Sequence, residues 1–427
     1  MRIWRIDISF YTPTYRIKLR KINMKKTLIC LALAGVLTAC GGSDNNDSSQ
    51  TENPPPSSSN KIGVLTDGTI QGANYSINGV IKQTNERGEF EYQEGDEVTF
   101  SIGEIVIGKL KAASRITPQE LANDEDTRLN LMIFLQSLDK DGNHDNGIEI
   151  PSNLTPLSSA KIDFSLPTSE FIEVLETELS KIPELTNPVV VTPEEAQENF
   201  RKAIFKDIAG IWSTTTNDDG ESSEVILVID ENGHYTLGEA IPQDSDNEGN
   251  GLEKGEISLN SLTGDFTAST SIDTNTDWGL ADPNQQRTMT LAFDGSQLTI
   301  QEKLNPQEGA TFNRLENNVN GIIGAWQSAT DHLFIFNANN TYFLLDPVGD
   351  DQPDEEGSCG DPGIEFGKYQ VRDNKLYINS RDILVDTNGC AGLSETGASS
   401  GLTLNIQANT LVLHPQGEGP VSLQRVK

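Results

Sequence analysis

Hydrophobic and polar residues alternate with a period of two over most of the chain after residue 60, which is the pattern of half-buried β-strands. Between residues 61 and 111 the alternating runs are short and are separated by Gly, Asn or Asp, which favours a small antiparallel β domain. Apolar residues follow helical spacing instead at 117–138, 168–181 and 193–206. We therefore expect residues 61–206 to form one β-sandwich-like module with a helical segment.

The second half of the chain contains an internal repeat, which indicates that one domain has been duplicated. The repeated segments are Gly210-Ile211-Trp212 with Gly324-Ala325-Trp326, 225–237 with 333–345, Asp273-Thr274-Asn275 with Asp386-Thr387-Asn388, and Asn313-Arg314-Leu315 with Gln424-Arg425-Val426. The offsets are 114 residues for Trp, 113 for Asp and 111 for Arg, so the order is kept with only small insertions. The two copies span 207–318 and 319–427.

Each copy divides into eight short strands joined in sequence by hairpin turns. In the second copy these strands are expected near 323–329, 332–337, 341–346, 364–371, 375–380, 401–407, 409–414 and 421–426. Sequential antiparallel strands close most simply into an up-and-down barrel, because closure leaves no sheet edge exposed. The fold class predicted for the whole chain is therefore mainly β, with a small sandwich and helices followed by two eight-stranded barrels.

Barrel closure would place the first and last strands side by side. Arg314 would then stack on Trp212 and Arg425 on Trp326, each arginine capping one end of a barrel core. This arrangement resembles the G-x-W and terminal Arg signature of the calycins, the lipocalins and their relatives.

Residues Thr84, Gly88 and Phe90 form a T-x-x-x-G-x-F pattern in the first module. It resembles a turn of transthyretin-like sandwiches of the carboxypeptidase-regulatory type. A similar opening, followed by a helix and a Leu-Asp-x-Asp-Gly-Asn segment, occurs in uncharacterised bacterial lipoproteins and large adhesins.

A secretory signal precedes these modules. From Met24 the chain has Lys25-Lys26, an apolar run at 28–36 and the small-residue sequence Leu37-Thr38-Ala39-Cys40. This last segment resembles the lipobox of bacterial lipoproteins, which implies cleavage before Cys40 and acylation of its thiol. The apolar run is too short to span a bilayer as a mature helix.

The remaining N-terminal segments follow from this assignment. Residues 1–23 precede a complete signal, so we expect translation to start at Met24 and the signal peptide to span 24–39. Residues 40–60 contain almost nothing apolar and would form a disordered tether behind the lipid. Gly41 follows the acylated position, and its resemblance to enteric sorting rules implies the outer membrane as the location.

The mature chain is strongly acidic. The full sequence has a net charge of −33, and loss of residues 1–39 removes eight Lys/Arg and one Asp, leaving 23 basic against 63 acidic residues, a net charge of −40. Such a surface repels nucleic acid and favours cationic proteins or divalent cations as partners, although the charge would also serve solubility alone. Cys359 and Cys390 are expected to form a disulfide in the oxidising compartment outside the cytoplasm, since their loops would share one end of a barrel.

The sequence offers little catalytic chemistry. No nucleophile motif, Gly-rich phosphate loop or zinc-spaced Cys/His pair is present, so we expect neither an enzyme nor a resident cofactor. Oxygen side chains occupy alternate positions around a glycine, as in calcium loops, at Asp139, Asp141, Asn143 and Asp145. Because a bidentate Glu at the twelfth position is missing, a polar helix-terminating turn explains these residues equally well.

Acidic residues concentrate in the long loops that an up-and-down barrel places at one end. Within residues 346–365 these are Asp346, Asp350, Asp351, Asp354, Glu355, Glu356, Asp361 and Glu365; within 239–256 they are Glu239, Asp244, Asp246, Glu248, Glu253 and Glu256. Such crowding is useful when a cationic partner binds. The function predicted is a non-catalytic surface interaction lipoprotein acting through these rims; the alternatives are an inhibitor of a cationic lysozyme or protease, and a carrier of small ligands inside the barrels.

Overall fold

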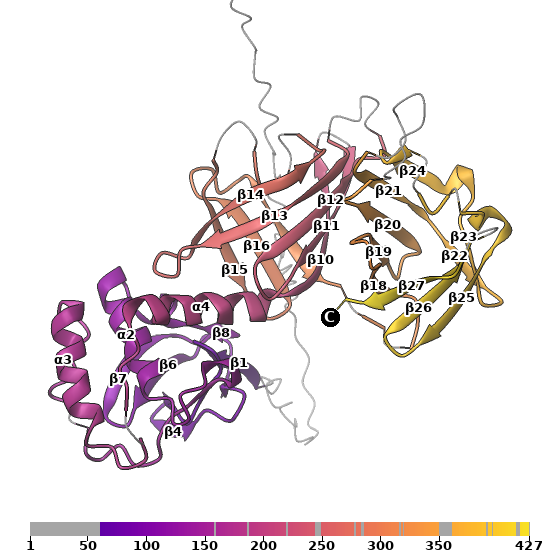
Figure 1. The fold of residues 1–427 in the computed structure, drawn as a ribbon. Helices are drawn as coiled ribbons and strands as arrows, with labels where there is room; N and C mark the ends of the chain where they lie inside the picture. Colours follow the sequence, from indigo (N-terminus) through magenta and orange to yellow (C-terminus); the bar gives the residue numbers. More distant parts are fainter. Residues whose placement is uncertain are drawn as a thin grey trace, which may run out of the picture.

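The computed structural model describes residues 60–426 apart from short gaps, and shows a sheet-and-helix region, a closed barrel and a second curled sheet in succession (Figure 1). Outside the described residues are 1–59, 158, 186–187, 219–220, 244–248, 277–278, 283–285, 316, 319, 350–360, 390–391, 395, 416–418 and 427. The mainly β fold class is confirmed. No helix of the described ranges is long and apolar enough to cross a membrane.

The first region combines small sheets with four helices among its described residues. Its strands are β1 (Lys61–Leu65), β2 (Ile70–Gln71), β3 (Asn74–Ile77), β4 (Val80–Gln83), β5 (Glu89–Tyr92), β6 (Glu97–Ile102), β7 (Ile105–Lys111), β8 (Arg115–Ile116) and β9 (Ile148–Glu149). They form sheets in the orders β5-β1-β8 and β4-β3-β6-β7, and the pair β2-β9. The helices are α1 (Pro118–Leu121), α2 (Glu125–Ser137), α3 (Thr168–Leu179) and α4 (Pro193–Ile208), with a 3-10 turn at His144–Asn146.

Polar caps and aromatic anchors explain these elements locally. The buried Thr84 hydroxyl donates to the carbonyl of Ile70 at 2.6 Å, and Phe90 packs edge-on against Phe100 with ring centroids 5.1 Å apart, so the turn between them is fixed at both ends. Helices α1 and α4 begin where the sequence predicts first turns. Each starts with a capping box, Thr117 with Glu120 and Thr192 with Glu195, followed by Pro at the first position.

Helix α4 joins the first region to the barrel. Its apolar face includes the buried Phe200, Ile204 and Phe205, and these residues belong to one continuous core that also contains Trp212. Arg115 binds Asp207 near the end of the helix at 2.7 Å. In Figure 1, α4 lies between the two bodies.

The first barrel is closed and antiparallel. Its strands follow sequence order around the ring: β10 (Gly210–Asp218), β11 (Glu221–Ile229), β12 (His234–Ala240), β13 (Gly251–Leu259), β14 (Asp265–Asp273), β15 (Met289–Phe293), β16 (Gln297–Glu302) and β17 (Gly309–Arg314). Strand β17 returns to pair with β10, with Trp212 opposite Arg314. The predicted eight-stranded barrel is therefore confirmed for this copy.

The second copy is a ten-stranded curled sheet, which corrects the expectation of a second eight-stranded closed barrel. Its order is β22-β23-β25-β26-β27-β18-β19-β20-β21-β24. The strands are β18 (Gly324–Gln327), β19 (Leu333–Phe336), β20 (Thr341–Asp346), β21 (Gly363–Lys368), β22 (Gln370–Arg372), β23 (Lys375–Tyr377), β24 (Ile383–Asp386), β25 (Leu402–Gln407), β26 (Thr410–His414) and β27 (Val421–Arg425).

The two extra strands arise because one hairpin of the barrel is broken. Strands β21 and β22 are separated only by Tyr369, whose buried hydroxyl donates to the Asn337 carbonyl at 3.0 Å and whose ring packs on Phe336. Strands β23 and β24 are separated by residues 378–382, which contain a 3-10 turn. The predicted strand 364–371 is therefore split, and β24 was not predicted.

The same closure contact joins the first and last strands in both copies. The guanidinium carbon lies 4.3 Å from the indole centroid for Arg314 and Trp212, and 3.9 Å for Arg425 and Trp326. Each indole N–H donates to the carbonyl four residues earlier, at 2.8 and 2.7 Å. The guanidiniums donate to backbone carbonyls as well: Arg314 to Ala209 and Asp207, Arg425 to Ile323 and Gly321.

The glycine two residues before each tryptophan makes room for this arginine. A Cβ on Gly210 would lie 2.5 Å from a terminal nitrogen of Arg314, and one on Gly324 would lie 2.9 Å from Arg425. Both glycines also have positive φ, +141° and +123°. The G-x-W pattern is thus a steric requirement of the arginine contact.

A third apolar cluster lies between the two copies. It combines outward-facing side chains of the first barrel with residues of the second: Ile211, Ile226, Val228, Ala240, Leu252, Ala325, Leu333, Ile335, Phe343, Leu345, Ile364, Phe366 and Val385. At its centre Leu345 fills the space left by Gly238, since any Cβ there would collide with the leucine. The two copies therefore pack directly against each other.

Trp326→Ala tests the closure. The fully buried indole fills the core of the second copy, so its truncation should lower the free energy of unfolding of that copy by about 3–5 kcal/mol. Urea unfolding followed by the fluorescence of the remaining tryptophans measures the loss. The exposed Val371→Ala is the control, expected within about 0.5 kcal/mol of the unmodified chain; equal effects of the two changes would contradict the role given to Trp326.

Candidate functional site

A groove of about 640 Å³ runs between the outer face of the first barrel and the start of the second copy. Its lining includes the buried apolar residues Val228, Ile229 and Leu333, and the hydroxyl-bearing residues 269–271. Acidic residues in the lining are Asp230, Glu231, Glu256 and Asp331. Lys254 and His234 are the basic residues among the described lining. The lining thus combines apolar residues with charged residues that are predominantly acidic.

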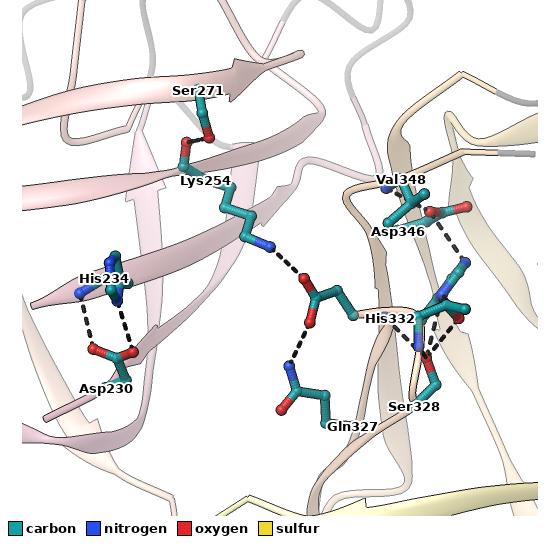
Figure 2. A network of polar contacts seen from close by, with 11 residues as sticks. Asp230, His234, Lys254, Ser271, Gln327, Ser328, His332, Asp346 and Val348 are labelled. Atoms are coloured by element: carbon teal, nitrogen blue, oxygen red, sulfur yellow. Dashed lines mark hydrogen bonds and ion pairs between the residues drawn. The ribbon is translucent and has the colours of Figure 1, made fainter. Parts of the chain in front are cut away.

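One ion pair bridges the groove. The Lys254 ammonium from β13 binds the Asp331 carboxylate from the β18–β19 turn at 3.0 Å, and Gln327 donates to the other oxygen of Asp331 at 3.2 Å (Figure 2). Asp331 has a positive φ of +67°, which fits a tight turn at this position. Both partners remain partly exposed, so the pair orients the turn more than it stabilises the fold.

A second pair lies on the wall formed by the first barrel. His234 and Asp230 are 2.9 Å apart across the β11–β12 turn, as Figure 2 shows. Partial burial opposes ionisation of Asp230, but hydrogen bonds from His234 and Asn232 hold the pKa of this carboxyl below its usual value. Asp230 is therefore a fixed negative charge at the edge of the groove.

Inside the first barrel and on the inner face of the second, curled copy, a buried glutamate accepts a hydrogen bond from a tyrosine on the neighbouring strand. Tyr235 donates to Glu253 in the first copy, and Tyr342 donates to Glu365 at 2.5 Å in the second. The backbone of a following loop donates to the same carboxylates, from Leu280 and Ala281 to Glu253 and from Ser394 to Glu365.

Burial raises the pKa of both glutamates. The hydrogen bonds act in the opposite direction, but burial has the larger effect. The pKa of Glu253 is raised to about 7, and the pKa of Glu365 is raised as well. The tyrosines and loops thus donate hydrogen bonds to two glutamates, Glu253 and Glu365, whose side chains would be ionised if they were in contact with water.

A further acidic position is buried in both copies but has different partners. Glu239 accepts from Ser223 at 2.5 Å, and its burial raises its pKa to about 7. The equivalent Asp346 lies 3.2 Å from His332 (Figure 2). Burial opposes ionisation of Asp346, yet the His332 contact and backbone N–H donors lower its pKa, and the Asp346 hydrogen bond raises the pKa of His332.

These positions correct the predicted acidic rim. Four residues assigned to it lie inside the barrels instead: Glu239, Glu253, Asp346 and Glu365. Their side chains share the inward face with the core because strand residues two apart point the same way. Of the other rim residues of the second copy, Asp361 is exposed, and Asp350, Asp351, Asp354, Glu355 and Glu356 lie outside the described residues, as do Cys40, Cys359 and Cys390.

The 139–145 loop is held by its own polar groups. Asp139 accepts from the Glu149 amide at 3.0 Å, and Asp141 accepts from the Asn143 amide and the Asn146 side chain at 2.8 and 2.9 Å. The carbonyl of Asp145 accepts from Lys206. In the described ranges, no group of three or more His, Cys, Asp or Glu side chains is arranged to hold a metal ion, so calcium binding by Asp139, Asp141, Asn143 and Asp145 stays a prediction.

A correct alignment of the two repeats in the sequence would have revealed the buried tyrosine–glutamate pairs. Ladder pairing equates Tyr235 with Tyr342, because Ile229 pairs with Tyr235 and Phe336 with Tyr342 immediately before each turn. The repeat aligned as 225–237 with 333–345 is therefore one residue out of register in these strands. The Asp-Thr-Asn repeat also continues to a Gly-Leu, 279–280 and 392–393, whose loops donate to the two glutamates.

Fold and site together define a mainly β protein with a closed eight-stranded barrel, a curled ten-stranded copy of it and a groove between them. No family model and no curated protein matches the chain. Among solved structures it is similar to a DUF3598-family protein of unknown function from Nostoc punctiforme, at 11% identity and a TM-score of 0.11, covering 53% of this chain and 99% of that one. A similarity at that score carries no argument about function.

Glu239 should make stability depend on pH. Its folded-state pKa of about 7 exceeds the unfolded value of about 4.3, so between these values the folded protein holds a proton that the unfolded chain has lost. The stabilisation is complete below about pH 4.3 and is lost as pH rises to about 7, at up to about 1.4 kcal/mol per pH unit.

Urea unfolding at pH 5, 6 and 7 in chelated buffer measures this slope. Glu239→Gln should make the slope less steep, with the remainder coming from Glu253, whose pKa is also raised to about 7. Glu231→Gln, on an exposed residue of the same barrel, should leave the slope unchanged. An unaltered slope in Glu239→Gln would rule out this residue as its source.

Proposed function

We propose that this chain is a non-catalytic cell-envelope lipoprotein, anchored through Cys40 at the bacterial outer membrane, which binds a basic protein partner in the groove between its two barrels. The observation that carries the proposal is the groove itself. Its lining combines four carboxylates with buried apolar residues, and the described basic side chains, Lys254 and His234, are each paired with an acidic one. Negative potential beside apolar residues suits a cationic, partly apolar surface.

The fixed position of the groove supports this assignment. The apolar cluster between the copies holds both walls in one orientation, so little ordering would be required on binding. The acidic residues of 350–360 would add a longer-range attraction, which raises association rates.

The barrel interiors favour this proposal over carriage of small ligands. Large side chains fill the cores, including Trp212, Phe266 and Phe312 in the first copy and Trp326, Phe336 and Tyr342 in the second. An inhibitor of a cationic enzyme remains compatible with the groove and would appear as loss of that enzyme's activity on binding.

The resemblances to calycins and to transthyretin-like sandwiches are part of the same proposal. The paired Trp–Arg contacts and their glycines support placing both copies among calycin-like barrels. The buried Thr84 and Phe90 support a transthyretin-like first module. Both assignments describe scaffolds, and neither names a ligand.

Lipidation is tested on the mature N-terminus. Because the thiol is the one feature that a plain secretory signal does not need, mass spectrometry should find an acylated Cys40 as the first residue. An unmodified peptide spanning residues 38–45 would refute the anchor.

Groove binding is tested with lysozyme as a basic probe, by isothermal titration at low and moderate salt. The variant Asp230→Asn, Glu231→Gln, Glu256→Gln removes three groove charges and should weaken binding about tenfold, equivalent to about 1.4 kcal/mol. The matched control Glu170→Gln, Glu173→Gln, Glu176→Gln removes three exposed charges from α3 and should weaken it far less. Equal weakening by both sets would indicate general charge attraction and contradict the groove.

A further inference from the structure

Each copy carries the same three oxygen-bearing residues at one end. The glutamate and the asparagine are buried in both copies, whereas the aspartate is partly exposed in the first copy and exposed in the second. Glu253 on β13 pairs in the ladder with Asp273 on β14, and Asn275 follows two residues later. In the second copy Glu365 on β21 pairs with Asp386 on β24, and Asn388 follows two residues later. The two constellations match residue for residue.

The asparagines are the unusual members. Asn275 and Asn388 are both 0% exposed, and neither the oxygen nor the nitrogen of either amide has a hydrogen-bond partner. Leaving such a buried group unsatisfied costs on the order of 1–3 kcal/mol. An apolar residue of similar size would avoid that cost, yet the same amide occupies the same position twice.

The first of these amides faces the neighbouring glutamate. A Cβ built on Gly279 would lie 3.3 Å from the Asn275 amide nitrogen and would collide with Oε2 of Glu253, so both side chains border the same small space. Oxygen and nitrogen of an amide are interchangeable in position, so a flipped Asn275 directs its oxygen there.

The two carboxylates bring negative charge to this space. The hydrogen bonds that Glu253 accepts come from neutral donors, the Tyr235 hydroxyl and the Leu280 and Ala281 amides. Asp273 is the direct ladder neighbour of Glu253, and Asp386 is the direct ladder neighbour of Glu365. A buried carboxylate such as Glu253 or Glu365, with a second carboxylate beside it, is stabilised in its charged form by a cation bound between the two.

We propose that each barrel binds one calcium ion between its glutamate, aspartate and asparagine oxygens: Glu253, Asp273 and Asn275 in the first copy, and Glu365, Asp386 and Asn388 in the second. The ligands are all oxygens, which excludes the softer metals that prefer His or Cys. Asp and Asn at alternate positions are typical of calcium-binding loops, and backbone or water oxygens complete such sites. Each ion would also hold the loop that donates to its glutamate against the barrel end.

This site is independent of the groove and of the 139–145 loop. The groove lines the outer face of the first barrel, whereas Glu253 and Asn275 are fully buried within it. Failure of calcium binding would therefore leave the proposed partner binding untouched, and the reverse holds equally.

The test uses residues 41–427, which contain every described element, after treatment with chelator. Calcium titration followed by calorimetry and native mass spectrometry should give two ions per chain that survive Asp139→Asn, Asp141→Asn, and calcium should raise the melting temperature. The double variant Asn275→Leu, Asn388→Leu should lose both ions and the calcium-dependent rise.

A second double variant separates ion binding from a purely structural role of the amides. Asn275→Asp, Asn388→Asp adds one carboxylate to each site, so it should bind calcium at least tenfold more tightly and melt lower than the unmodified chain in chelator. No calcium-dependent change in the unmodified chain would overturn the proposal and leave buried water as the partner of the amides. Calcium binding retained in the leucine variant, or unaltered in the aspartate variant, would overturn it equally.

Discussion

The whole assembly depends on the contact between an arginine of a last strand and the tryptophan of a first strand. Arg314 covers the Trp212 indole and at the same time donates to the carbonyls of Asp207 and Ala209 at the end of α4. Carbonyls at a helix C-terminus have no partners within the helix and carry partial negative charge, so a guanidinium satisfies both needs. The same arginine, Arg314, therefore both closes the first barrel and helps to attach the barrel to the preceding region.

Closure also determines how the two copies meet. Residues at equivalent repeat positions lie on both sides of the cluster between them, as Leu252 and Ile364 do. Gly238 and Leu345 are themselves equivalent and in direct contact, which is the geometry of a two-fold contact between like surfaces. Because Gly238 is small and Leu345 is large, the equivalent surfaces of the two copies fit together at this point. The groove is the part of this contact where polar residues such as Lys254 replace apolar ones.

The sequence predicted those features that depend on rare or positionally distinctive residues. Tryptophan and arginine at the ends of a repeat indicated the closure, and the helical spacing of apolar residues indicated α3 and α4. The broken hairpin at Tyr369 could not be predicted, because it depends on a hydroxyl contact with a residue 32 positions away.

The buried acids were missed for a different reason. In so acidic a chain, Glu239 and Glu253 have the same local context as surface residues, and their burial depends on which face of the strand they occupy. A one-residue error in aligning β12 with β20 exchanges the two faces. It therefore hid the equivalence of Tyr235 and Tyr342, the residue pair that would have identified an inward-facing polar set.

Some equivalent positions of the two copies differ and others are identical. On the outer face, Lys254 of the first copy corresponds to Phe366 of the second; the first lines the groove and the second lies in the cluster between the copies. At one end of each copy, by contrast, the buried tyrosine and glutamate, and the aspartate and asparagine at and just after the end of the next strand, recur unchanged. Packing alone would not preserve this set, because apolar residues fill a barrel end at lower cost than buried carboxylates. This end therefore reflects a requirement shared by both copies, whereas the outer faces reflect the contact that each copy makes with the other.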